Sequence, residues 1–447
     1  MKAVIRRLAV LLMCAILLSV GLPLPVAAAL ESPPETNDVG SAFLCNLENN
    51  LILYEKNADT PLYPASGVKI MTGLLACRAL AERTEESVTI TEGMIAGVTG
   101  RKMGLAKGEV LTVGDLLYAA ICGGYNDAAC AVACLASGSV AAFVQDMNRE
   151  CERIGTTKTK FTNPTGLHDP AMITCVRDMA LIAREAYGNS LFMVISSART
   201  YTVPETNVSA ARLLTNRNAL ISDSSRNYYN GYCRGMNAGM TDEGGWCVVT
   251  VSERGGASNL CIVMAARDAN QKELIPAYVY TNRLLSWANR NYSYRTILQA
   301  GDEVDTRKVS MTGISKSEAD VLVATDLKVY LPADADPKTD LTTVLQLHGG
   351  KLEAPIQAGD EVGEVFVAYD GQTVGKAKLT VGEDFARNGF LDGMQRFRAY
   401  LVSRTFIATA VCFTILLLLF LRMTRSRGGR YGIRTVRRRR HYRRRFH

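Results

Sequence analysis

The sequence predicts an α+β domain in which helices cover an antiparallel sheet, followed by a small all-β domain and one C-terminal transmembrane helix. Helical and strand patterns mix up to about residue 291, which is typical of a sheet covered by helices. Beyond residue 295, helical patterns give way to short alternating segments separated by glycine-containing turns. Residues 405–421 carry no charge and are mostly apolar, which is close to the shortest length that spans a bilayer.

Three helices of the first domain have clear sequence signals. The spacing of apolar residues in SGVKIMTGLLACRALA predicts a largely buried helix that begins at Ser66. Thr112, with Asp115 three residues later, resembles the capping box that opens a helix. Thr174 is predicted to open a third helix, which Gly188 ends.

Two β-rich runs in the first domain predict a hairpin. Residues 246–253 and 259–267 are rich in β-forming side chains, and Gly255 and Gly256 lie in the turn between them. A long helical stretch over residues 271–291 follows. This order of a strand pair and several helices supports the α+β class.

The two ends of the chain predict export and a membrane anchor. Basic residues, an apolar run and the small residues Ala27, Ala28 and Ala29 form the pattern of a cleaved signal peptide. A retained anchor helix is the alternative, but Pro23 and Pro25 favour cleavage. We therefore expect five segments: a signal peptide (1–29), the first domain (38–292), a small β-sandwich (295–382), the transmembrane helix (405–421) and a tail (422–447).

The tail after the apolar segment holds twelve arginines and no acidic residue. By the positive-inside rule, this tail is cytoplasmic and the two domains lie outside the membrane. Such a tail could bind nucleic acid, but contact with anionic head groups is the simpler interpretation, and no nucleic-acid partner is expected. Subtracting the tail's arginines and the three basic residues of the signal from the formal charge of +8 leaves −7, so the exported part is mildly acidic.

The cysteines and histidines give no sign of a metal site. Ten of the twelve cysteines lie between Cys45 and Cys261 without a Cys-x-x-Cys pair, and two of the four histidines are in the tail. No zinc site and no cofactor is therefore predicted. Cysteines in apolar segments most often serve as small buried hydrophobes, although an exported protein can cross-link some of them.

Ser66 and Lys69 form the candidate catalytic pair. Side chains three residues apart on a helix project from the same face, so the lysine can accept the proton of the serine hydroxyl. It does so only when it is neutral for part of the time, which requires burial or nearby cations that lower its pKa. A Ser-x-x-Lys motif alone is weak evidence, because about one or two chance matches are expected in a chain of this length.

The surrounding segments strengthen the interpretation. LYEKNADTPLYPASGVKIMTGLLA, GLAKGEVLTVGDLLYA, FTNPTGLHDP and RDMALIA occur in an order that resembles the low-molecular-mass penicillin-binding proteins, the serine-type D-alanyl-D-alanine carboxypeptidases. The likeness extends from Ala42 to about Asn291, and KLEAPIQAGDEVGEVFVAYDGQTVGKAKL resembles that family's C-terminal domain.

The resemblance implies a β-lactamase/transpeptidase-like fold and an acyl-enzyme mechanism. Ser66 would attack the bond between the two terminal D-alanines of a peptidoglycan stem peptide, with Lys69 as the base. Water would then release the shortened peptide. The stem peptide is the implied partner, and β-lactams are the implied covalent ligands.

Two other motifs of that family are degenerate here. The second motif, Ser-x-Asn, aligns with Gly124 and Asn126 at its first and last positions, so the hydroxyl is missing while the amide that contacts the substrate is kept. The third motif, Lys-Thr-Gly, aligns with Asn237, Ala238 and Gly239, and only the glycine is kept.

These departures change the expected electrostatics. With Asn237 in place of a cation, we expect Lys69 to be more fully protonated and a poorer base. Arg217 matches an arginine that in several relatives contacts the substrate carboxylate, and a surface ion pair is an equally good interpretation of this residue. The N–H of Met240 is expected to join that of Ser66 in stabilising the oxyanion.

Two functions from different classes remain open on this basis. The first is a membrane-anchored D-Ala-D-Ala carboxypeptidase with impaired turnover. The second is an inactive relative that binds wall peptides or partners as a scaffold. A β-lactamase is a third and weaker alternative, since no residue for efficient deacylation can be identified.

Overall fold

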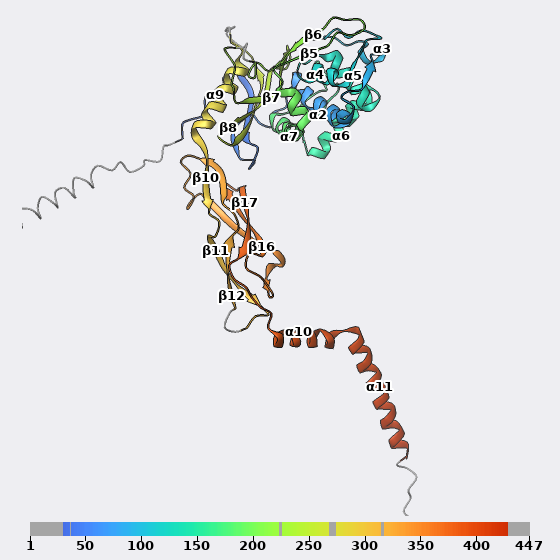
Figure 1. Cartoon of the computed structure of the whole chain (residues 1–447), viewed down its shortest axis with the longest axis vertical. Helices are drawn as coiled ribbons and strands as arrows, with labels where there is room; N and C mark the ends of the chain where they lie inside the picture. Colours follow the sequence, from blue (N-terminus) through green and yellow to red (C-terminus); the bar gives the residue numbers. More distant parts are fainter. Residues whose placement is uncertain (1–29, 36, 223–225, 268–273, 314–316, 428–447) are drawn as a thin grey trace, which may run out of the picture. The chain divides into compact units, whose positions relative to one another are not determined.

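The computed structural model describes residues 30–35, 37–222, 226–267, 274–313 and 317–427 (Figure 1). The predicted signal peptide and most of the arginine-rich tail lie outside these residues.

The first domain is built on a five-stranded antiparallel sheet with the strand order β2-β1-β9-β8-β7. Strands β8 and β9 are buried along almost their whole length, which requires cover on both faces of the sheet. They form the predicted hairpin, with Gly255 and Gly256 at the turn. The strands are β1 (Val39–Asn46), β2 (Ile52–Lys56), β7 (Cys233–Thr241), β8 (Gly245–Arg254) and β9 (Ala257–Ala266).

Helices cover both faces of this sheet, as Figure 1 shows. The central helix α2 packs against α4, α5 and α7, and most of its residues are buried. On the other face, α9 packs against β8 and β9. The helices are α2 (Val68–Leu80), α4 (Val113–Ile121), α5 (Asn126–Ser137), α6 (Val140–Ile154), α7 (Val176–Tyr187), α8 (Ser190–Ser197) and α9 (Pro276–Asn291).

Short elements complete the first domain. Two small antiparallel pairs, β3 with β4 and β5 with β6, lie outside the main sheet. Their bounds, with those of α3 and the two 3-10 turns, are β3 (Ser87–Thr89), β4 (Val110–Thr112), β5 (Thr200–Val203), β6 (Arg212–Thr215), α3 (Glu92–Ile95), η1 (Ala65–Gly67) and η2 (Ala81–Arg83).

The helix starts agree with the sequence in one case and differ in another. Thr112 and Asp115 form the predicted capping box at the start of α4, in which the backbone N–H of each residue donates to the side chain of the other at 3.0 Å. The cap of α7 is Cys175, whose sulfur accepts the N–H of Asp178, so the prediction of Thr174 was wrong by one residue. The prediction that Gly188 ends α7 is confirmed.

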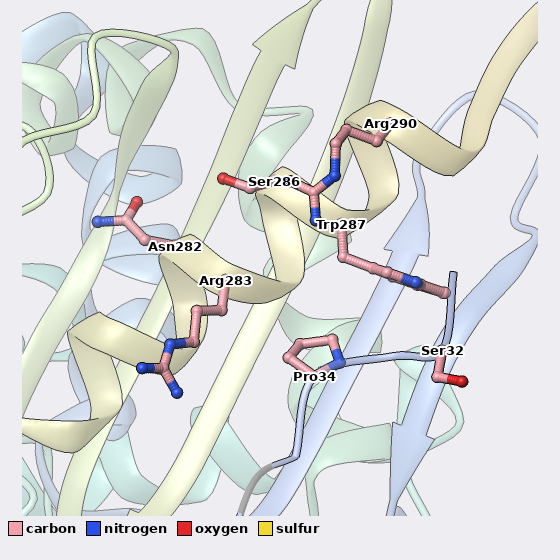
Figure 2. Close-up of a pocket in the computed structure, with 7 residues that line it drawn as sticks. All are labelled: Ser32, Pro34, Asn282, Arg283, Ser286, Trp287 and Arg290. Carbon is pink, nitrogen blue, oxygen red and sulfur yellow. The ribbon is translucent and has the colours of Figure 1, made fainter. Parts of the chain in front are cut away.

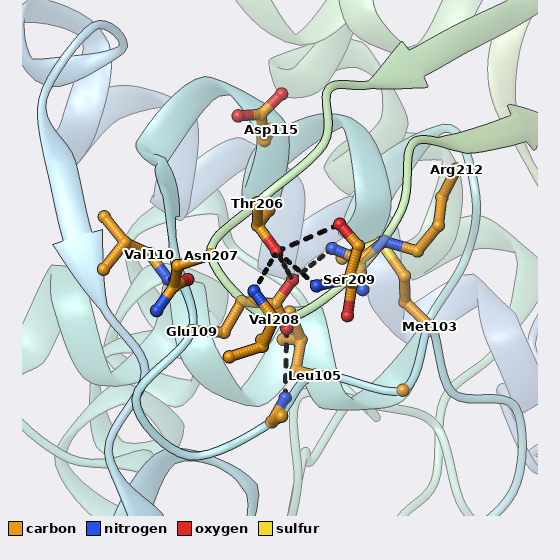
Figure 3. A network of polar contacts seen from close by, with 12 residues as sticks. Met103, Leu105, Glu109, Val110, Asp115, Thr206, Asn207, Val208, Ser209 and Arg212 are labelled. Atoms are coloured by element: carbon orange, nitrogen blue, oxygen red, sulfur yellow. Dashed lines mark hydrogen bonds and ion pairs between the residues drawn. The ribbon is translucent and has the colours of Figure 1, made fainter.

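A buried polar network fixes the β5–β6 pair to the segment before α4 (Figure 3). The carboxylate of Glu109 is fully buried and forms an ion pair with Arg212 of β6. It also accepts hydrogen bonds from the backbone N–H of Ala106 (3.1 Å) and from the hydroxyl of Thr206 (3.1 Å). Because β6 leads directly into Arg217, this network holds in place the segment that carries a candidate site residue.

The first described residues run along α9 (Figure 2). The indole N–H of Trp287 donates to the carbonyl of Glu31 (2.7 Å), and the N–H of Glu31 donates to Asn291 Oδ1 (2.7 Å). Arg290 forms an ion pair with the Glu31 carboxylate at 2.9 Å. A shallow cavity of about 420 Å³ lies beside these contacts, lined by Ser32, Pro34, Asn282, Arg283, Ser286, Trp287 and Arg290.

The chain after α9 forms the predicted all-β domain. Strand β10 pairs with β13, and the remaining strands form a sheet in the order β14-β16-β17-β12-β11-β15. The strands are β10 (Tyr292–Leu298), β11 (Glu303–Ser310), β12 (Glu318–Val323), β13 (Leu327–Pro332), β14 (Leu341–Leu347), β15 (Leu352–Glu353), β16 (Glu361–Tyr369) and β17 (Gln372–Val381), with a 3-10 turn η3 (His348–Gly350).

Two helices follow the β domain. The first is α10 (Gly389–Val402), and the second is α11 (Arg404–Arg427). Among the described residues, one single helix is long and apolar enough to cross a membrane, and it covers Arg404–Thr424 within α11. This segment contains the predicted range 405–421 and is consistent with membrane anchoring.

The cysteines that the structure describes are all free thiols. Apart from Cys412 of α11, they are buried or half-buried in the first domain.

Candidate active site

Ser66 lies in the short 3-10 turn η1, directly before α2. Lys69 follows in the first turn of α2 and is 4% exposed. The turn is tight, because Ala65 has a positive φ of 47° and the N–H of Gly67 bonds to the carbonyl of Pro64. The local sequence therefore places the serine at the start of a buried helix, where backbone N–H groups and the helix dipole favour negative charge.

Ser66 and Lys69 line one cavity of about 150 Å³ together with nearly all the other predicted site residues. No acidic side chain is among its lining residues, whereas three are basic. The lining residues are Ser66, Lys69, Gly100, Arg101, Gly124, Asn126, Thr165, Gly166, Leu167, Arg217, Asn237, Ala238, Met240 and Thr241.

Gly239 is the one predicted site residue outside this lining, and it packs directly against the serine. A Cβ atom at Gly239 would lie 2.2 Å from Ser66 Oγ and 2.7 Å from Ser66 Cβ. Contacts this short do not occur between real side chains, so only glycine fits at this point of β7. The candidate nucleophile is thus held against the backbone of the edge strand β7.

Lys69 is held by the loop opposite α2. Its Nζ donates to the carbonyl of Thr165 at 2.5 Å. That loop is itself fixed, because Asn163 Oδ1 accepts the N–H groups of Thr165 (3.1 Å) and Gly166 (2.9 Å). The amine is therefore placed within the cavity by bonds that do not involve Ser66.

The expectation that Lys69 is more fully protonated than it would be beside a cation at position 237 stays a prediction, but its surroundings still lower its pKa. Burial lowers the pKa of Lys69 to about 7, and the positive charges of Arg217 and Arg101 contribute in the same direction. The negative charge that Cys130 would carry as a thiolate opposes them. Burial is the largest cause, so the lysine can be neutral near pH 7 without a cation at position 237.

Asn126 connects the cavity to the loop above it. Its side chain is 5% exposed and donates to the carbonyl of Thr99 (2.9 Å). The next residue, Asp127, accepts hydrogen bonds from the N–H groups of Met103 (2.9 Å), Gly104 (2.8 Å) and Leu105 (3.1 Å). These bonds hold the loop of residues 99–105 at the edge of the cavity.

The third-motif residues of β7 face the cavity without the family's side chains. Asn237 is 4% exposed, and its Oδ1 has no hydrogen-bond partner among the described residues. Ala238 is buried, and Met240 is 42% exposed. A buried amide oxygen without a partner is costly, so a ligand N–H at this point would be favoured.

Arg217 reaches the cavity from the segment after β6. It is half-buried, its N–H bonds to the carbonyl of Cys122 (3.2 Å), and its carbonyl accepts the hydroxyl of Tyr278 (2.9 Å). Among the described residues, Arg217 forms no ion pair, and it lines the cavity.

Arg101 is a cavity residue that the sequence analysis missed. Its Nε donates to the carbonyl of Gly123 (3.0 Å), and its guanidinium lies 4.6 Å from the centre of the Tyr125 ring. Nothing in the local sequence marks it, because its position depends on the fold of the loop. Thr165 was missed in the same way, although its segment was among those that carried the family resemblance.

A serine with a buried lysine one turn behind it, set against the edge strand of a sheet covered by helices, defines the class of serine acyl-transfer enzymes that includes the penicillin-binding proteins. The sequence profile described as D-alanyl-D-alanine carboxypeptidase matches residues 27–268, and the chain belongs to this family. The profile of the penicillin-binding protein 5 C-terminal domain matches residues 292–387. The predicted family and fold class are therefore confirmed.

Individual relatives cover most of the chain. The D-alanyl-D-alanine carboxypeptidase DacF of Bacillus subtilis is 27% identical over 379 residues, which is 83% of this chain and 93% of the relative. DacA of Escherichia coli is 28% identical over 362 residues, which is 79% of this chain and 85% of the relative.

Two solved structures have a similar fold. Penicillin-binding protein 5 of Haemophilus influenzae has a TM-score of 0.61 and 26% identity, and the match covers 80% of this chain and all of that structure. PBP3 of Streptococcus pneumoniae has a TM-score of 0.63 at 20% identity, covering 78% and 99%, and at that identity it supports the fold alone.

Proposed function

We propose that this protein is a membrane-anchored serine-type D-Ala-D-Ala carboxypeptidase that trims peptidoglycan stem peptides. The observation that carries the proposal is the shared cavity of Ser66 and Lys69, with a lysine whose pKa burial lowers to about 7. Membership of the carboxypeptidase family supports the choice of reaction.

The proposed reaction begins with the neutral amine of Lys69. It accepts the proton of Ser66 Oγ while the oxygen attacks the carbonyl carbon between the two terminal D-alanines. The N–H groups of Ser66 and Met240 stabilise the negative oxygen of the tetrahedral intermediate. The C–N bond then breaks, the proton passes to the leaving amine of D-alanine, and water hydrolyses the acyl-serine.

The remaining cavity residues bind the peptide in this proposal. Arg217 is the cation for the terminal carboxylate, and Asn126 and the backbone of β7 hold the peptide chain. The unpartnered Oδ1 of Asn237 is available for a substrate N–H.

We place the two domains outside the cytoplasmic membrane, with α11 as its anchor and the arginine-rich tail on the cytoplasmic side. The apolar character of Arg404–Thr424 supports the anchor. The distribution of arginines supports the orientation.

A second candidate is an inactive relative that binds wall peptides as a scaffold. The residues that favour it are Gly124, Asn237 and Ala238, which lack the side chains of the family's second and third motifs. In this case the cavity would still receive a peptide or a β-lactam, but turnover would be absent.

Labelling of the full-length protein in detergent with a fluorescent penicillin distinguishes these candidates. We expect a covalent adduct that maps to Ser66 by peptide mass analysis, its loss in Ser66→Ala, and release of D-alanine from a synthetic pentapeptide. An adduct without D-alanine release favours the scaffold. Absence of both adduct and release overturns the carboxypeptidase.

A further inference from the structure

Arg101 has no role in the reaction proposed above, although it lines the candidate active-site cavity. Burial separates the inner end of this cavity from its mouth. Lys69 and Asn237 are each 4% exposed, so they belong to the inner end. Met240 is 42% exposed and Arg101 is exposed as well, so these two side chains mark the mouth, where a bound ligand emerges.

The guanidinium of Arg101 is held in one orientation at this mouth. Its Nε donates to the carbonyl of Gly123 (3.0 Å), and its Nη2 donates to the hydroxyl of Tyr125 (3.4 Å). Its central carbon lies 4.6 Å from the centre of the Tyr125 ring. The ring itself is packed against the turn, because a Cβ atom at Gly123 would lie 2.4 Å from it. The planar fork of Arg101 is therefore pre-organised before a ligand binds.

The backbone of Arg101 is fixed as firmly as its side chain. Its carbonyl accepts the N–H of Asn126 at 2.7 Å, and the side chain of Asn126 donates to the carbonyl of Thr99 at 2.9 Å. Between these two bonds, a Cβ atom at Gly100 would lie 2.9 Å from Asn126 Nδ2. The loop thus rests on the first residue of α5, and Arg101 leaves it at a defined point.

The positive charge of Arg101 has no acidic partner. Among the residues that the structure describes, it forms no ion pair, and no acidic side chain lines the cavity. The carboxylate of Asp127 accepts three N–H groups of the loop and lies outside the lining. Arg101, Lys69 and Arg217 therefore make the cavity a site for an anionic ligand. Because the proposed reaction assigns the terminal carboxylate to Arg217, Arg101 is available for a second anionic group.

The size of the cavity determines which part of a peptide reaches Arg101. Its volume of about 150 Å³ is below the roughly 300–1,000 Å³ of pockets that enclose a drug-sized ligand. The buried Oδ1 of Asn237 has no partner among the described residues, which favours a peptide N–H at the inner end. The two terminal D-alanines therefore fit inside, and the residue before them lies at the mouth beside Arg101.

We propose that Arg101 is a specificity residue, which selects stem peptides whose residue before the two D-alanines has a side chain ending in a carboxylate. The outer N–H groups of the guanidinium donate charge-assisted hydrogen bonds to that carboxylate. A side chain ending in an ammonium group is disfavoured by the three cations of the cavity. This inference deepens the proposed function and rests on it, because the ligand is the same stem peptide.

The test compares three peptides of the form acetyl-X-D-Ala-D-Ala whose X side chains have the same length. Each side chain has four methylene groups and ends in a carboxylate (L-2-aminopimelate), in the corresponding amide, or in an ammonium group (L-lysine). Binding to full-length Ser66→Ala in detergent is measured by titration calorimetry, so turnover does not contribute. We expect the acidic peptide to bind about fivefold more tightly than the amide, and the amide more tightly than the lysine peptide.

Substitution of Arg101 in the same Ser66→Ala background should change the ratio of affinities rather than all affinities together. In Arg101→Gln the preference for the acidic peptide over the amide should fall to about twofold or less, with the affinity for the amide kept. In Arg101→Glu the ratio of acidic to lysine affinity should shift by at least about tenfold in favour of lysine. The preference should also decrease with added salt when Arg101 is present.

Lys102→Gln is the matched control. Lys102 is exposed, carries the same charge, adjoins Arg101 in the chain and does not line the cavity. Its substitution should leave all three affinities and their ratios unchanged. The specificity role is refuted if Arg101→Gln alters the ratios no more than Lys102→Gln does, if it weakens all three peptides by one factor, or if no peptide binds.

The proposed function is tested separately by the release of D-alanine from these peptides by the wild type. A wild type that binds the acidic peptide preferentially but forms no Ser66 adduct and releases no D-alanine would retain the specificity and lose the carboxypeptidase. Equal rates of release from the acidic peptide and the amide at low concentration would overturn the role of Arg101 and leave the carboxypeptidase in place.

Discussion

Gly239→Ala would place one methyl group where the Ser66 side chain now lies. The added carbon would meet Ser66 Oγ at 2.2 Å and Ser66 Cβ at 2.7 Å. The hydroxyl can rotate away, but Cβ moves only with the backbone of η1. Opening the second contact to an ordinary 3.4 Å requires a shift of about 0.7 Å in the turn or in β7.

A misplacement of about 1 Å near the chemistry can cost about a hundredfold in rate. We therefore expect acylation of Gly239→Ala by fluorescent penicillin to fall by about 30- to 100-fold. We also expect a stability loss of about 1–3 kcal/mol, because the contact is overpacked. Both are measured on the full-length protein, at a pH above the pKa of Lys69.

Gly93→Ala is the control for this substitution. A Cβ at Gly93 of α3 would meet no atom within 4 Å, so neither acylation nor stability should fall. If Gly239→Ala is acylated within about threefold of the wild-type rate, Ser66 is not held against β7 as described.

Three further predictions concern stability. The pKa of Lys69 is about 7 in the folded protein and 10.5 for an ordinary lysine, so between these pH values the unfolded state binds more protons. Wild-type stability, measured by urea unfolding, should therefore rise with pH across this window relative to Lys69→Met. Parallel curves would contradict the lowered pKa. Arg212→Met leaves the buried Glu109 carboxylate without its cation and should lower the free energy of unfolding by about 3–5 kcal/mol, as measured with urea. Adding Glu109→Gln should recover much of this loss. A loss below about 1 kcal/mol would show that the pair is not buried. Thr112→Ala removes the cap of α4 and should cost about 1 kcal/mol in thermal unfolding, whereas Thr112→Ser should keep most of the stability.

Local patterns in the sequence predicted the parts of the site that depend on short-range geometry. The Ser66–Lys69 spacing and the capping box at Thr112 are set by helix geometry, and both were recognisable from residue types alone. The cap of α7 was misplaced by one residue, because Cys175 is a less common capping residue than Thr174.

Properties that arise from tertiary packing were not predictable in this way. The lowered pKa of Lys69 comes mainly from burial, which is a property of the folded domain and not of the motif. Arg101 reaches the cavity only because its loop folds back over it, and Gly124 and Arg217, which are far apart in the chain, line the same cavity. The sequence showed which side chains of the motifs were missing, and the fold was needed to find which other residues line the cavity.

The carboxylate of Asp127 accepts hydrogen bonds from three backbone N–H groups of the loop of residues 99–105, and this affects how ligands reach the cavity. A carboxylate with this many backbone partners keeps residues 103–105 in one arrangement before any ligand arrives. This edge of the cavity is thus pre-organised, so little ordering entropy is lost when a peptide binds. Selectivity between ligands then depends on the dimensions of a rigid cavity edge, and Asp127 contributes to it although it does not line the cavity.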